Sequence, residues 1–140
     1  EGATFDANLH QVLGAKPYGA GKVTSHGKLA RLEWEGTPSL EINTFGLRVR
    51  DGRPNQAGLV FWGDAAANIP LFGATLLVQP PLVRGGVRLL DGDGGRVFSA
   101  PVDPTMVGTT RFYQAWFRDP GHPDGTGVGV TIGVEVTFVP

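Results

Sequence analysis

Two stretches near the end of the chain decide its fold: TRFYQAWFR (residues 110–118) and VGVTIGVEVTF (residues 128–138). In the second stretch, apolar residues alternate with small or polar ones over eleven positions. This period of two predicts a strand with one buried and one wetter face. The first stretch has aromatic side chains on both faces, as expected of a central strand covered on both sides. We therefore expect a hairpin on which the rest of the chain packs.

The composition predicts an all-β protein. Among 140 residues, 22 glycines and 11 prolines leave no window of three helical turns without a helix breaker. Eight or nine short strands at intervals of about 8 to 12 residues are typical of a two-sheet antiparallel β-sandwich, Ig-like or jelly-roll-like. Before the hairpin, the candidate strands are residues 28–35, 42–50, 58–63, 75–78, 83–90 and 96–100. The last two are expected to form a hairpin of their own across residues 91–95, whereas residues 65–70 are expected to form a loop.

The charge pattern argues against two kinds of partner. The net charge is −1 and the basic residues are scattered among acidic ones, so no stripe for nucleic acid is expected. No apolar run approaches the roughly 20 residues of a membrane-spanning helix. The chain contains no cysteine, and a chain of this length needs no disulfide to be stable.

The N-terminal segment has a strand pattern of its own. Ala3, Phe5, Ala7 and Leu9 alternate with polar residues, and residues 14–21 have the composition of a linker. The sequence thus predicts a strand extension and linker over residues 1–17 and a β-sandwich domain over residues 18–140. The strand has two alternatives. It pairs within its own domain, or it adds to an open sheet edge of a neighbouring copy.

Four aromatic residues are candidates for a glycan platform, because flat rings stack on the apolar faces of sugars. They are Trp34, Trp62, Tyr113 and Trp116. In a small β-protein such residues are more often part of the core, where each removes roughly 150–250 Å² from water. Gln114 is the polar exception on the central strand, and we expect a structural role with hydrogen-bond partners.

Four aspartates in glycine-rich turns are candidates for a calcium site, since Ca²⁺ prefers several oxygen ligands. They are Asp91, Asp93, Asp119 and Asp124. The full calcium-loop pattern fails, and aspartate is also an ordinary turn residue. Otherwise we expect no metal: the three histidines show no zinc spacing. No serine has the surroundings of a nucleophile. We therefore predict no catalytic residues, no enzyme activity and no cofactor.

Five motifs carry a resemblance to a known family: YGAGK (18–22), GTPSL (36–40), ANIPL (67–71), TLLVQPPLV (75–83) and RFYQAWFRDP (111–120). With them, residues 18–140 resemble an uncharacterised β-rich domain of secreted and surface proteins from planctomycetes and related bacteria. The resemblance implies a secreted or cell-surface location and brings no catalytic residues. Members of that family often have cysteine where Lys22, Leu77 and Val139 stand in this chain.

Two functional hypotheses follow from these residues and from the resemblance. The first is an extracellular structural or adhesive subunit that joins copies of itself head-to-tail by N-terminal strand addition, which produces a filament or surface layer. The alternative is a carbohydrate-binding module of a secreted protein. The expected partners are copies of the chain itself or glycans.

Overall fold

The computed structural model describes residues 14–140, which form eleven strands and no helix. Every pair of strands is antiparallel. The strands are β1 (Ala15–Tyr18), β2 (Arg31–Glu35), β3 (Gly46–Arg50), β4 (Ala57–Gly63), β5 (Ala66–Leu71), β6 (Ala74–Val78), β7 (Val83–Arg84), β8 (Arg88–Leu89), β9 (Arg96–Ser99), β10 (Thr110–Arg118) and β11 (Val128–Thr137). The all-β prediction is confirmed.

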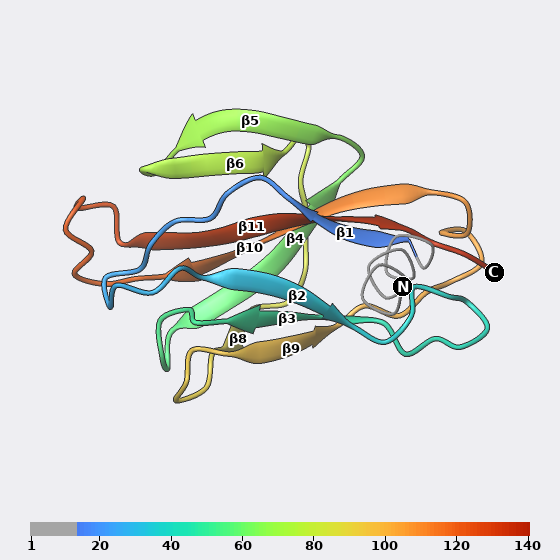
Figure 1. Cartoon of the computed structure of the whole chain (residues 1–140), viewed down its shortest axis with the longest axis horizontal. Helices are drawn as coiled ribbons and strands as arrows, with labels where there is room; N and C mark the ends of the chain where they lie inside the picture. The colour runs from blue at the N-terminus through green and yellow to red at the C-terminus, as the bar shows by residue number, and fades with distance from the viewer. Residues whose placement is uncertain (1–13) are drawn as a thin grey trace, which may run out of the picture.

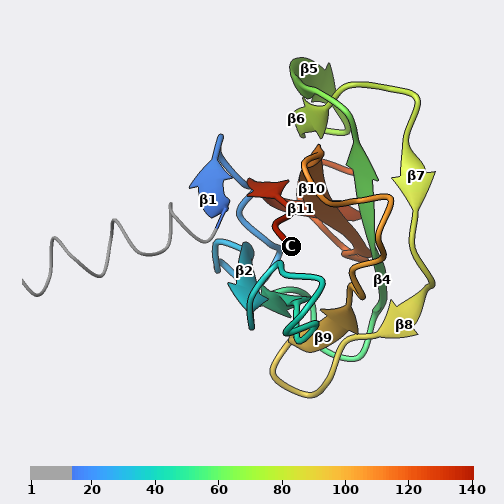
Figure 2. The same cartoon turned by 90° about the vertical axis from the view of Figure 1, so that its right-hand side faces the viewer.

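The strands form three sheets (Figures 1 and 2). The six-stranded sheet has the order β1-β11-β10-β4-β7, and β8 pairs with β4 beside β7. The three-stranded sheet has the order β2-β3-β9, and β5 and β6 form a separate hairpin. The predicted β10–β11 hairpin is confirmed, and β10 is a central strand between β11 and β4.

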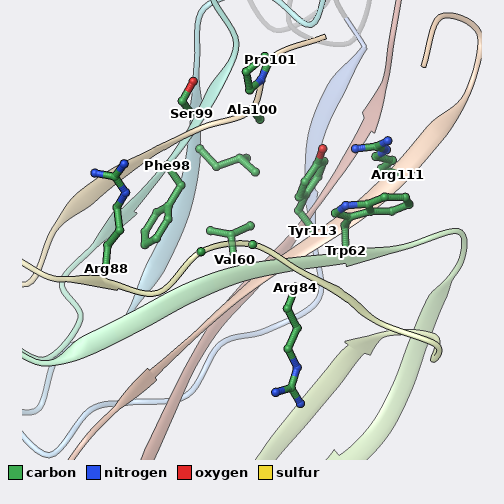
Figure 3. Close-up of a pocket in the computed structure, with 13 residues that line it drawn as sticks. Val60, Trp62, Arg84, Arg88, Phe98, Ser99, Ala100, Pro101, Arg111 and Tyr113 are labelled. Carbon is green, nitrogen blue, oxygen red and sulfur yellow. The ribbon is translucent and has the colours of Figure 1, made fainter. Parts of the chain in front are cut away.

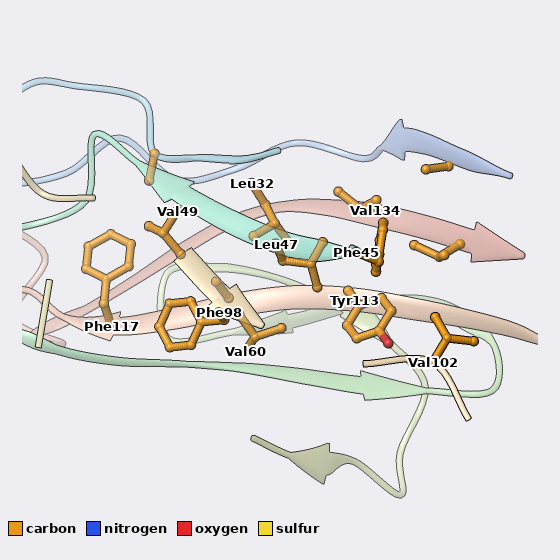
Figure 4. Packing of buried hydrophobic residues seen from close by; sticks show 14 of the residues in the cluster. Leu32, Phe45, Leu47, Val49, Val60, Phe98, Val102, Tyr113, Phe117 and Val134 are labelled. Atoms are coloured by element: carbon orange, nitrogen blue, oxygen red, sulfur yellow. The ribbon is translucent and has the colours of Figure 1, made fainter. Parts of the chain in front are cut away.

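The main hydrophobic core contains side chains from both the six-stranded and the three-stranded sheet (Figure 4). Leu47 and Phe98 enter it from the smaller sheet, and Val60, Tyr113 and Val134 enter it from the larger one.

A smaller core lies on the other face of the six-stranded sheet, where Phe61 packs with Leu76 and Val78 of the β5–β6 hairpin. Gln114 joins these elements. Its Oε1 accepts a hydrogen bond from the Leu77 backbone N–H, and its Nε2 donates to the carbonyl oxygens of Thr75 and Thr131. The structural role expected for Gln114 is confirmed, since the residue is fully buried and bonded.

One register shift changes which face each half of β11 presents. Gln114 pairs with Gly133 but Trp116 pairs with Val130, so β11 contains one extra residue, a β-bulge. After the bulge, Val134 and Val136 face the main core. Before it, Gly129 lies opposite Phe117 on the core side. The predicted unbroken alternation is therefore wrong: Val128 and Val130 face away from the core that holds Val134.

Three sequence-based expectations about elements were wrong. The linker-like run at residues 14–21 contains β1, which pairs with β11. Residues 65–70 are mostly strand β5 and not a loop. The segments at 83–90 and 96–100 do not pair with each other, because β8 pairs with β4 whereas β9 pairs with β3. The expected strand at residues 3–9 lies outside the described residues.

Candidate functional site

A cavity of about 360 Å³ opens between β9 and the chain segment 84–88 that connects β7 to β8 (Figure 3). We call it the β9 slot. Its thirteen lining residues are Leu47, Val60, Trp62, Arg84, Gly85, Gly86, Arg88, Phe98, Ser99, Ala100, Pro101, Arg111 and Tyr113. The slot lies between an edge of the three-stranded sheet and an edge of the six-stranded sheet.

The floor of the slot is the main core itself. Leu47, Val60, Phe98 and Tyr113 are buried core residues that also line the cavity. Burial raises the pKa of Tyr113, and a hydrogen bond from Arg111 only partly offsets this effect. The tyrosine is therefore a neutral phenol at physiological pH, and the slot reaches an apolar interior.

The walls of the slot are cationic. The guanidinium of Arg111 lies 3.7 Å from the ring centroid of Trp62, a cation–π contact. Arg88 lies beside Phe98, whereas the side chain of Arg84 extends away from the cavity (Figure 3). None of the lining residues is acidic. The slot thus combines an apolar floor with a positive rim.

The outer edge of β9 supplies backbone hydrogen-bonding groups. Ala100 N–H donates to the carbonyl of Phe45, which precedes β3, so alternate residues of β9 bond toward β3. The backbone N–H and C=O groups of Val97 and Ser99 therefore point away from β3. Within residues 14–140, no strand pairs with this edge. An unpaired edge of this kind is a template for an added strand.

The four candidate aromatic residues do not form one platform. Tyr113 is only 3% exposed, so its assignment to an exposed platform was wrong: the ring fills the core. Trp34 of β2 and Trp62 of β4 pack against the main core, whereas Trp116 packs against the smaller core on the other face. Trp116 is three positions after Tyr113 on β10, so alternation along the strand places the two rings on opposite faces.

The four candidate aspartates are not brought together either. Asp91 accepts backbone hydrogen bonds from Asp93 and Gly95 inside the β8–β9 turn. These bonds lower the pKa of Asp91. Among the described residues, no group of three or more acidic or metal-ligating side chains is placed to hold a metal ion. Asp91 is therefore a turn residue that organises its own loop.

The other two aspartates, Asp119 and Asp124, lie in the loop between β10 and β11 and form ion pairs with basic side chains. The Lys22 ammonium is 2.5 Å from Asp124 and also donates to the oxygens of Phe72, Thr126 and Val128. The Lys22 hydrogen bond is the main cause that lowers the pKa of Asp124. Lys22 is buried, which no sequence pattern indicated, because an isolated lysine is usually exposed.

Asp119 is fully buried and accepts hydrogen bonds from the Ser25 backbone N–H and hydroxyl. Its carboxylate is also 3.2 Å from the Arg53 guanidinium. Burial alone would raise the pKa of Asp119, but these bonds outweigh it and the pKa is lowered. Among residues 14–140, the Ser25 hydroxyl donates a hydrogen bond to the Asp119 carboxylate and accepts one from Arg53, so this cluster anchors the loop.

Comparison with known proteins identifies no relative: no family model, no curated protein and no solved structure matches this chain. Among residues 14–140, no helix is long and apolar enough to cross a membrane.

Proposed function

We propose that this chain is an extracellular structural or adhesive subunit, and that residues 3–9 of one copy add to β9 of the next. The observation that carries the proposal is the unpaired edge of β9 beside a cavity that opens onto the main core. Addition of one strand would pair the free backbone groups and cover apolar side chains at the same time. Because donor and acceptor are different surfaces, the assembly is head-to-tail and does not close.

The length of the slot agrees with the spacing of the two large donor side chains. Residues 98–101 line the slot over about 13 Å at the usual rise of a strand, and Phe5 and Leu9, four positions apart, are also about 13 Å apart on a strand. On an added strand, Ala3, Phe5, Ala7 and Leu9 share one face, which would point to the floor of the slot. The two large side chains would occupy the cavity, and the two alanines would allow close approach.

The charges also agree. The slot has three arginines on its rim, of which Arg88 and Arg111 lie on the cavity side. The N-terminal segment contains two acidic residues, Glu1 and Asp6, and no lysine or arginine before Lys16. Such complementarity directs the encounter and sets the register more than it adds affinity.

The length of the connection favours addition to another copy. β1 and β7 lie at the two edges of the six-stranded sheet, four strand spacings or about 19 Å apart. The slot opens beside residues 84–88, at the β7 edge, and reaches β10 through Arg111 and Tyr113, whereas the N-terminal segment joins at Gly14, just before β1. Four residues lie between Leu9 and Gly14, and this connection spans at most about 18 Å. To reach the outer edge of β9 in its own copy, the connection would have to pass around the sheet, so we propose that the strand binds the slot of a second copy.

Two variants test the two sides of this contact. Deletion of residues 1–13 removes the donor and keeps β1. Gly86→Trp blocks the acceptor, because Gly86 lines the slot and a Cβ there has no heavy atom within 4 Å, so the backbone accepts a side chain. Gly92→Trp is the matched control, since Gly92 is equally open but lies in the β8–β9 turn.

We expect the original chain and Gly92→Trp to form assemblies, and the other two variants to be monomers. Light scattering coupled to size-exclusion chromatography and electron microscopy measure the difference. Assembly of the deletion variant to the same size as the original chain would refute the proposal.

We infer that the six-stranded and three-stranded sheets are the two layers of a β-sandwich, which is supported by the core they share. We also propose a location outside the cell, as the resemblance of residues 18–140 to secreted planctomycete-type domains implies. An adhesive or scaffolding subunit needs no catalytic residue, which agrees with the anchoring roles of Ser25 and Asp119.

A further inference from the structure

A second cavity, of about 570 Å³, lies over β4 and β10 beside the β10–β11 loop. We call it the Trp116 groove. Leu59 and Trp116 form part of its lining and belong to the smaller core, on the face of the six-stranded sheet that does not face the main core. The exposed side chains of Arg84 and Arg118 line it as well. The groove is therefore separate from the floor of the β9 slot.

The bulge in β11 contributes to this groove. Without the extra residue, Val128 would share a face with Val134 and point into the main core. With it, Val128 lies on the side of Trp116 and lines the groove. The bulge thus turns an apolar side chain out of the core, as bulges often do beside binding sites.

Phe72 lies beside the groove, where its ring stacks on Trp116 with centroids 5.9 Å apart. It forms the two-residue turn between β5 and β6 with Gly73, and both have positive φ, 51° and 69°. Such a turn favours Asn-Gly, and phenylalanine adopts this backbone at a cost. The residue is 46% exposed. Folding alone does not explain a bulky, exposed ring at this position.

The charges around the rings indicate the ligand. The Arg84 guanidinium lies 5.8 Å from the Trp116 ring centroid, and Arg118 follows at the end of β10. The residues that line the groove include no carboxylate to neutralise these two cations. Aromatic faces bind the apolar face of a pyranose ring, and arginine binds carboxylate or sulfate through two parallel hydrogen bonds.

We infer that the Trp116 groove binds an acidic polysaccharide, with a sugar ring against Trp116 and Phe72 and its acidic group on Arg84 and Arg118. Single-stranded nucleic acid also combines rings with anions. It usually requires a longer basic groove than two arginines, and the net charge of this chain is −1. The acidic group is a carboxylate or a sulfate, and one probe of each kind distinguishes the two.

The experiment measures binding of the full chain to four probes: polygalacturonate, dextran sulfate, neutral dextran and a thymidine oligonucleotide. We expect binding to one or both acidic polysaccharides and none to neutral dextran. The stronger of the two acidic probes identifies the acidic group. Equal binding of neutral dextran, preference for the oligonucleotide, or no binding of any acidic polysaccharide would overturn the inference.

Three variants locate the site. Arg118→Gln should weaken binding about tenfold, the equivalent of one charge-assisted hydrogen bond. Arg50→Gln, an exposed position on β3, removes the same charge elsewhere and should change affinity less than twofold, since distant charges are largely screened.

Phe72→Asn should also weaken binding, while the melting temperature stays the same or rises, because asparagine suits the turn. Unchanged affinity in both Arg118→Gln and Phe72→Asn would exclude this groove.

Discussion

At the scale of single residues, buried charges position the loop between β10 and β11. Lys22 is 7% exposed and Asp119 is fully buried, yet each has several partners of opposite charge or polarity. Among the described residues, no buried side-chain nitrogen or oxygen lacks a hydrogen bond. Charges of this kind are tolerated only when they are paired, so the loop is held in one conformation beside the Trp116 groove.

Asp119→Asn tests the ion pair. The variant loses the charge that Arg53 and Ser25 bind. We expect the free energy of unfolding to fall by about 2–3 kcal/mol at pH 7, somewhat below the usual cost of breaking a buried pair because Arg53 is partly exposed. Urea denaturation measures it. Asp64→Asn, at an exposed position, is the control and should leave stability unchanged.

The same pair has a defined pH dependence. The pKa of Asp119 is lower in the folded chain than the value of about 3.9 expected after unfolding. Its stabilising contribution is therefore complete above about pH 4 and is lost as the pH falls through the folded pKa. The difference in stability between the original chain and Asp119→Asn should shrink below pH 4. A difference that stays constant down to pH 2 would contradict this assignment.

At the scale of elements, the bulge in β11 gives a prediction opposite to that of the sequence pattern. By simple alternation, Gly129 lies on the wetter face, and Gly129→Val would strengthen the strand. In the structure, a Cβ at Gly129 would collide with the Phe117 ring in the main core. We expect Gly129→Val to lower the free energy of unfolding by about 2–3 kcal/mol, at the upper end of overpacking costs. Thermal denaturation measures the change, and the control is Gly92→Val, because a Cβ at Gly92 has no heavy atom within 4 Å.

The same strand shows how far the sequence could predict this fold. The composition and the period of two identified an all-β chain and the β10–β11 hairpin, because these depend on local preference and one apolar face. The bulge depends on hydrogen bonds between strands, so no pattern in β11 alone reveals it. Residues 65–70 were expected to form a loop, but they are mostly strand β5, in which Pro70 is tolerated because β5 is an edge strand.

The candidate sites were less predictable. The turn aspartates and the aromatic residues were identified as residue types, but spacing in the sequence does not specify which strand lies beside β9 or which face Trp116 occupies. The partners of β8 and β9 are distant in the chain, and sequence neighbours were a poor guide to them. The β9 slot and the Trp116 groove are both products of these distant pairings.

At the scale of the whole molecule, the point where the N-terminal segment joins and the slot lie beside opposite edges of the six-stranded sheet. The chain leaves β1 at one edge, and the slot opens beside β7 and β8 at the other. Each subunit in the proposed filament therefore has one free donor and one free slot, independent of each other. A variant without the donor strand still has its slot, and a variant with a blocked slot still has its donor strand. This property distinguishes strand addition from nonspecific association.

Mixing the two defective variants makes this independence measurable. The chain without residues 1–13 keeps its slot, and Gly86→Trp keeps its donor strand, so each alone should be monomeric. Mixed in equal amounts, they should form a one-to-one heterodimer and nothing larger, because the second slot is blocked and the second donor is missing. Native mass spectrometry distinguishes the two chains by mass. Larger species would indicate a contact other than strand addition, and two separate monomers would show that residues 1–13 do not bind the slot.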